Sequence, residues 1–138
     1  MPVAQDHQPP RHQAAIGILR QRFGERLSVA ASVREHHSHT TTRIGSELPD
    51  AVVFAKSTDE VAEIVRICSE HQCPIIPFGV GSSLEGHVNA PLGGVSIDLN
   101  GMDRVLEVNA EDLDVRVQPG VTREALNTHL RDQGLFFP

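Results

Sequence analysis

The strongest constraint on the fold is a short apolar run that leads directly into a glycine-rich segment. Residues 74–87 read PIIPFGVGSSLEGH, in which three glycines and two serines follow an apolar run. Ile75, Ile76 and Phe78 are typical of a buried strand. A strand that ends in such a segment presents bare backbone N–H groups, which suit an anionic ligand. The pattern predicts a loop that binds a phosphate or a diphosphate.

Two common phosphate-binding motifs do not fit this loop. Gly81 and Gly86 have the spacing of a Walker A motif, but residues 87–88 are His and Val where Lys and Ser or Thr would follow. Gly79 and Gly81 could open a Rossmann fingerprint, but the third glycine comes too late, and residues 89–94 cannot begin a helix. These differences argue against a nucleoside triphosphatase. We expect loop amides, and not a helix terminus, to hold the ligand.

The loop resembles the pyrophosphate loop of FAD-linked oxidases of the vanillyl-alcohol oxidase and p-cresol methylhydroxylase (PCMH) type. Its SLEGH ending at residues 83–87 is most similar to the cytochrome-linked flavin D-lactate dehydrogenases and the glycolate oxidase flavin subunit. The resemblance extends to PDAVVF at 49–54, MDRV at 102–105 and VQPGVT at 117–122. It implies an α+β fold, the first subdomain of a PCMH-type FAD-binding domain, with a βαβ unit followed by antiparallel strands and a helix.

The resemblance also implies FAD as the cofactor and assigns its contacts residue by residue. The expected cofactor-binding residues are Pro77, Gly79, Val80, Gly81, Ser82, Ser83, Gly86, His87, Pro119 and Gly120. Some members of the superfamily attach FAD covalently through a histidine near this loop. Because the RSGG run of the berberine-bridge type is absent, we expect His87 to lie near the flavin without a bond to it. No residue of the chain is expected to be catalytic.

The activity implied by the resemblance is that of a flavin oxidoreductase. Its substrate would be a D-2-hydroxy acid, D-lactate or a glycolate-like acid, and its electron acceptor a cytochrome or a quinone. The chain closes on Leu135, Phe136 and Phe137, apolar residues with nothing after Pro138 to pack against, so we expect the amino-terminal part of a larger enzyme that is inactive alone. If the protein instead ends at Pro138, a non-catalytic nucleotide-binding or interaction module is the alternative.

Composition limits the other classes of function. The 138 residues are enough for one domain, and a formal net charge of −6 without Trp or Tyr gives neither a basic surface nor a stacking platform for nucleic acid. No apolar run approaches the ~20 residues of a membrane span. Residues 1–12 lack the apolar centre of a secretory signal. We expect a protein of the cytoplasm, or one bound peripherally at the inner membrane.

The order of expected elements follows from the hydrophobic pattern. Residues 1–12 are expected to be a disordered tail, residues 13–48 an N-terminal helix (13–23) and a polar linker (34–46), and residues 49–138 an incomplete FAD-binding domain. A strand at 51–55, a helix opened by a capping box at Ser57 and a strand at 75–78 form the βαβ unit. Residues 95–99, 105–108 and 113–117 are expected to be antiparallel strands. Thr122 caps a last helix that ends at Gly134.

Two groups of residues have side chains that could ligate a metal. His36, His37 and His39 could hold a transition metal, but their polar surroundings favour a solvated linker. Cys68 and Cys73 have no second pair to complete four ligands, and Cys68 continues the apolar seam of a helix. We therefore expect reduced, buried thiols and no metal.

Overall fold

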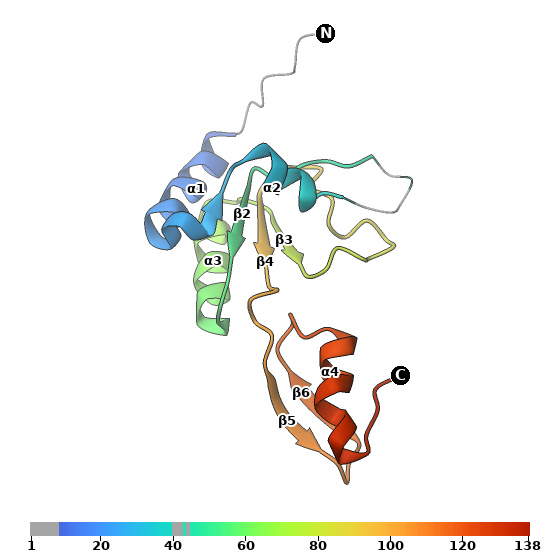
Figure 1. Ribbon diagram of the computed structural model, residues 1–138. Coiled ribbons are helices and arrows are strands. Elements are labelled where there is room, and N and C mark those ends of the chain that lie inside the picture. The colour runs from blue at the N-terminus through green and yellow to red at the C-terminus, as the bar shows by residue number, and fades with distance from the viewer. Residues whose placement is uncertain (1–8, 40–42, 44) are drawn as a thin grey trace.

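The structure, a computed structural model, describes residues 9–39, 43 and 45–138. Figure 1 shows two lobes, which we call the N lobe (residues 9–102) and the C lobe (residues 103–138). The N lobe contains α1 (Pro10–Phe23), the 3₁₀ turn η1 (Gly24–Arg26), β1 (Leu27–Ser28), α2 (Ala31–His36), β2 (Ala51–Phe54), α3 (Thr58–Glu70), β3 (Ile75–Phe78) and β4 (Val95–Asp98). The C lobe contains β5 (Val105–Asn109), β6 (Asp114–Val117), α4 (Arg123–Leu130) and the 3₁₀ turn η2 (Arg131–Gln133).

The N lobe is built on a four-stranded sheet in the order β1-β2-β4-β3. Strands β2, β4 and β3 are parallel, and β1 is antiparallel to β2. The expectation that residues 95–99 form an antiparallel strand was wrong, because the long segment after β3 returns the chain to the other end of the sheet before β4 begins. All four residues of β4 are buried, including Ser96 and Asp98, as befits a central strand.

The two faces of this sheet have different coverings. Alternate strand residues such as Val53, Val95 and Ile97 belong to the main apolar core together with residues of α1 and α3. Figure 1 shows these two helices side by side against the sheet. The intervening residues, among them Phe54 and Phe78, point to the opposite face, where they meet the end of α2.

Helix α3 begins with the predicted cap. The Ser57 hydroxyl accepts a hydrogen bond from the Glu60 backbone N–H at 3.2 Å, and the Glu60 carboxylate accepts one from the Lys56 N–H at 2.8 Å. Two further bonds of 2.7 and 2.8 Å join this carboxylate to Arg26. The hydrogen bond with Arg26 lowers the pKa of Glu60 to about 2. The cap therefore also fixes α3 to the turn after α1.

In the C lobe, β5 and β6 form the expected antiparallel hairpin. Thr122 caps α4, its hydroxyl accepting from the Ala125 N–H at 3.2 Å, and Leu126 and Leu130 turn inward. Helix α4 itself ends at Leu130, and its 3₁₀ extension η2 ends at the predicted Gly134, which has a φ of +69° in the left-handed region.

The amino-terminal third differs from the sequence-based picture. Helix α1 begins at Pro10, inside the segment expected to be a tail, and residues 1–8 lie outside the described part of the chain. Helix α2 occupies the first residues of the expected linker, and His37 and Ser38 are buried. His36 and His39 are exposed, and the described residues contain no group of three metal-ligating side chains.

Both cysteines are free and buried at the end of α3. The Cys73 N–H donates to the Cys68 carbonyl at 2.8 Å, and the hydrogen bond between the two thiols, with burial, raises the pKa of Cys68. On α3, Cys68 is buried together with Ile64 and Ile67. In the described part of the chain, no helix is both long and apolar enough to span a membrane.

Candidate functional site

The glycine-rich segment forms an open loop at the carboxyl end of β3. Of the hydrogen bonds within the described residues, none is donated by a backbone N–H between Gly79 and Val88. Ten consecutive residues therefore have backbone donors without a partner in the described part of the chain, and the first nine of them are at least partly exposed to water or a ligand. Unpaired N–H groups on an exposed loop are a suitable binding surface for an anion.

Two of the loop glycines adopt backbone conformations that residues with a side chain rarely adopt. Gly81 has a φ of +70° and Gly86 a φ of +75°. A Cβ on Gly81 would also lie 3.0 Å from the Phe78 ring, so the loop folds back closely over the last residue of β3. At Gly79 a Cβ would meet nothing within 4 Å, which leaves the backbone there accessible from outside.

Two adjoining hollows surround this loop. The first is lined by Pro77, Gly79, Val80, Gly81, Ser82, Ser83, His87 and Val88. The second is lined by Gly79, Val80, Asn100, Pro119, Gly120, Val121, Thr122 and Arg123. Gly79 and Val80 belong to both hollows, so nine of the ten residues proposed from the sequence lie around one continuous surface. Gly86 lines neither hollow and accepts a hydrogen bond from the Asn89 N–H at 3.1 Å.

Gly120 brings the C lobe to this surface. Its N–H donates to the Met102 carbonyl at 2.8 Å. A Cβ at this position would lie 2.5 Å from the Leu99 carbonyl oxygen and 2.7 Å from that of Asn100, so only glycine allows the two backbones to approach. The sequence identified Pro119 and Gly120 through the resemblance, and the structure supplies the steric reason for the glycine.

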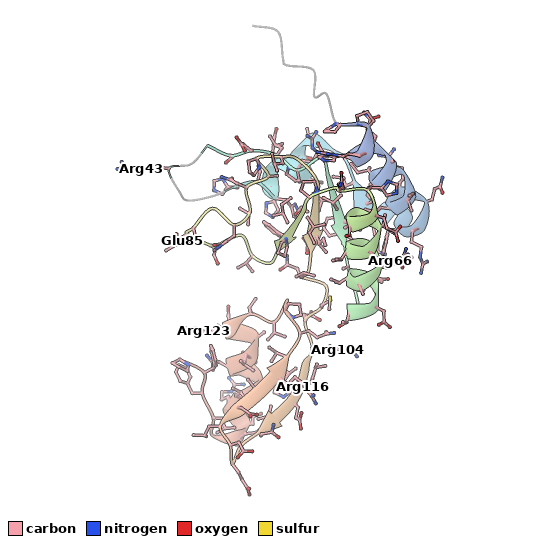
Figure 2. All side chains as sticks on the ribbon, turned by 180° about the vertical axis from the view of Figure 1, so that it is seen from behind. Arg43, Arg66, Glu85, Arg104, Arg116 and Arg123 are labelled. Atoms are coloured by element: carbon pink, nitrogen blue, oxygen red, sulfur yellow. The ribbon has the colours of Figure 1, made fainter. Side chains whose placement is uncertain are left out.

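The first turn of α4 borders the second hollow. Figure 2 shows Arg123 at the end of α4 nearest the N lobe and Glu85 at the outer end of the glycine loop. As expected, no helix follows the loop directly. The chain nevertheless brings a helix N-terminus and a guanidinium close to Gly79 from a later segment, and both favour an anionic ligand.

Ser83 and His87 interact within the loop. The Ser83 hydroxyl and His87 Nδ1 form a hydrogen bond, and the His87 side chain is otherwise exposed at the first hollow. This bond spans the turn that contains Gly86. It leaves Nε2 of the imidazole free to reach a bound molecule.

Three residues that were not predicted as site residues support the loop from the end of α2 and the end of β4. His37 Nε2 lies 2.8 Å from an Asp98 carboxylate oxygen, and both side chains are buried. Although burial alone would raise it, the pKa of Asp98 is lowered by hydrogen bonds from His37 and from Asn100. The Asn100 side chain in turn donates to the Gly79 carbonyl at 2.7 Å. No local motif signals this group, because His37 and Asp98 are 61 residues apart.

Comparison with known proteins agrees with the geometry. Residues 49–138 match a family described as an FAD binding domain. The chain is 47% identical over 114 residues to a probable mitochondrial D-lactate dehydrogenase of Danio rerio, covering 83% of this chain and 23% of the relative. It is 48% identical over 91 residues to a mitochondrial D-lactate dehydrogenase (cytochrome) of Arabidopsis thaliana, covering 66% of this chain and 16% of the relative.

A solved structure gives the same fold. Substrate-bound p-cresol methylhydroxylase superposes with a TM-score of 0.76 at 23% identity, over 91% of this chain and 25% of the other. At this identity the likeness concerns the fold alone. The chain spans about a quarter or less of the length of these proteins. The family match covers well over half of the residues, and the chain therefore belongs to the FAD binding domain family with the PCMH-type fold, and its cofactor is FAD.

Proposed function

We propose that this chain is the FAD-binding portion of a flavin dehydrogenase that oxidises a D-2-hydroxy acid, D-lactate or a close relative, and passes the electrons to a cytochrome or a quinone. The observation that carries the proposal is the open glycine loop with its free amides, in a chain whose aligned residues are 47% and 48% identical to two proteins named D-lactate dehydrogenase.

The residues present fit the diphosphate of FAD. The loop from Gly79 to Val88 has unpaired N–H donors, and Gly79 leaves open space where a side chain would stand. Two phosphate groups carry charge that such donors and a helix N-terminus satisfy. The hydroxyl of Ser82 adds a donor on the same side, and the Ser83 hydroxyl, which is bonded to Nδ1 of His87, borders the same hollow.

In this proposal the loop residues and the Pro119–Gly120 segment hold the cofactor from two sides. Gly79, Gly81 and Gly86 give the loop its shape, Pro77 sets its direction as it leaves β3, and Val80 contributes its amide. Pro119 and Gly120 form the opposite wall, while His87 lies beside the flavin without a bond to it. When bound, FAD supplies the hydride-accepting chemistry, and these residues supply binding and orientation.

The test uses the complete gene product. We expect it to be isolated yellow, to release FAD on denaturation, and to lose its flavin colour when D-lactate is added without oxygen. A colourless protein that oxidises D-lactate, or one that needs added nicotinamide, would contradict the proposal.

A matched pair of glycine variants tests the loop separately. Gly81→Val places a branched side chain at a φ of +70° against the Phe78 ring and should abolish flavin retention. Gly134→Val imposes the same kind of strain at a φ of +69°, where a Cβ meets nothing within 4 Å. We expect this control to keep its flavin. Unchanged flavin content in a well-folded Gly81→Val protein would count decisively against the loop.

A further inference from the structure

A buried histidine–aspartate pair lies directly beneath the glycine loop. His37 is 3% exposed and Asp98 is 6% exposed. Nδ1 of His37 lies 2.8 Å from the Val33 carbonyl oxygen, and Nε2 lies 2.8 Å from the carboxylate of Asp98. A carbonyl oxygen can only accept, so Nδ1 donates to Val33, and Nε2 lies against the Asp98 carboxylate. Burying polar side chains is costly unless they are hydrogen-bonded, and here both ring nitrogens have a partner within hydrogen-bond distance.

The imidazole also packs against the residue that precedes the loop. Its ring centroid lies 4.3 Å from that of Phe78 and 5.8 Å from that of Phe54. Phe78 is in turn the side chain on which Gly81 rests. His37 therefore supports the loop at its first turn through an aromatic ring as well as through Asp98.

Asn100 connects Asp98 to the loop. The free carboxylate oxygen of Asp98 accepts from the backbone N–H of Asn100 at 2.8 Å and from its side-chain amide at 3.1 Å. The same amide donates to the Gly79 carbonyl at 2.7 Å. Fixing this carbonyl fixes the peptide plane between Gly79 and Val80, so the direction of the Val80 N–H is set as well.

We propose that His37, Asp98 and Asn100 form a positioning relay that sets the direction of the loop amides before the cofactor arrives. This inference rests on the proposed function, because it concerns the loop taken to hold the FAD diphosphate. The relay runs from α2 through the end of β4 to the first peptide of the loop. Preorganised donors bind an anion more tightly than donors that must be ordered on binding.

The relay is tested first at Asn100, its most exposed member. Asn100→Ala removes the donor to Gly79, and Asn100→Asp keeps the shape but replaces the donor with an acceptor. In the complete gene product we expect each to weaken FAD binding about tenfold, as loss of a hydrogen bond to the loop would. Each should also shift or broaden the backbone amide NMR signals of Gly79, Val80 and Gly81 in the absence of FAD.

Asn127→Ala is the matched control. The Asn127 side chain also bridges backbone groups, donating to the Phe137 carbonyl at 2.9 Å and accepting from the Phe137 N–H at 2.7 Å, but far from the loop. We expect this variant to lose similar thermal stability and to keep wild-type FAD affinity and wild-type loop amide signals.

Two substitutions of Asp98 separate a relay from simple packing. In Asp98→Asn, the new amide oxygen can still accept from Asn100, and the new NH₂ can donate to Nε2 of His37, so we expect loop signals and FAD affinity close to wild type. Asp98→Ala removes both contacts and should behave like Asn100→Ala. Equal FAD affinity and unchanged loop signals in the Asn100 variants and in Asp98→Ala would overturn the relay. A wild-type protein without FAD would instead overturn the proposed function, while the NMR comparison would still decide the relay.

Discussion

The N lobe and the C lobe differ in how well their apolar side chains are covered. In the N lobe, Leu19, Val53 and Ile64 are fully buried within one continuous core. In the C lobe, all of which is described, Leu126 and Leu130 are the only buried apolar residues. Leu113 and Phe136 are 80% and 71% exposed. The glycine loop therefore extends from a rigid body, whereas the opposite wall of the site belongs to a lobe with little core of its own.

Because the C lobe has so small a core, its position at the site depends on the junction at Gly120. The C lobe reaches the site through a backbone contact with residues 99–102, where three carbonyl oxygens surround Gly120. Along one side of the C lobe, a hollow lined largely by Val108, Leu113, Leu130, Phe136 and Phe137 remains open. Cofactor affinity should thus depend on the junction more than on the core of either lobe.

The largest expected effect is a loss of folding stability when the core of the N lobe is altered. Leu19→Ala should lower the free energy of unfolding by about 3 kcal/mol, since the cavity left by a fully buried leucine cannot collapse completely. Val117→Ala in β6, where the side chain is 36% exposed, should cost under about 1 kcal/mol. Urea unfolding followed by circular dichroism measures both. Equal losses would contradict the contrast between the lobes.

Gly120→Ala should disturb the backbone contact that joins the C lobe to the N lobe. A Cβ would lie within 2.8 Å of three backbone carbonyl oxygens, and overpacking of this kind costs about 1–3 kcal/mol. We expect a loss of FAD affinity of about tenfold, as about 1.4 kcal/mol is a factor of ten. The N lobe should remain folded by circular dichroism. Gly17→Ala, in the open middle of α1, is the control and should retain full affinity.

Acid should lower the folding stability of the N lobe by breaking the ion pair between Arg26 and Glu60. The pKa of Glu60 lies at about 2, below its ordinary value of 4.5, so its stabilisation is present above pH 4.5 and is lost as the pH falls towards 2. A bidentate pair at this degree of exposure should contribute about 1–2 kcal/mol. Glu60→Gln should flatten the acid limb of stability measured by urea unfolding. An unchanged acid limb would show that the pair contributes nothing.

The smallest expected effect is a gain in the C lobe. Leu113 has a φ of +56° and is largely exposed at the hairpin turn. Leu113→Gly should relieve the strain and stabilise the C lobe by about 0.5–1 kcal/mol. Thermal unfolding monitors the change. A loss of stability would mean that the leucine packs usefully despite its exposure.

Local sequence patterns predicted those parts of the fold that depend on neighbouring residues. Ser57 and Thr122 cap helices as expected, and Gly134 ends the last one. The patterns failed where distant contacts decide. The alternation in residues 95–99 resembles an antiparallel strand, yet β4 lies between two parallel strands, and the side chains on both of its faces are buried.

The candidate site shows the same division. The glycine loop is a contiguous motif, so its residues could be proposed from sequence and resemblance. His37 stood in a polar stretch and was interpreted as solvated, because nothing nearby in the sequence reveals its partner Asp98 or its packing on Phe78. Asn100 gave no signal at all, since an asparagine after a strand is typical of an ordinary turn.

The central claim is that the free amides between Gly79 and Val88 hold the diphosphate of FAD against the Pro119–Gly120 segment. Hydrogen–deuterium exchange of the complete gene product, compared with and without FAD, tests it most directly. The account predicts that FAD slows exchange in peptides covering residues 79–88 and 119–123, while the hairpin at residues 105–117 exchanges as before. Tight FAD binding that leaves exchange at residues 79–88 unchanged would contradict it.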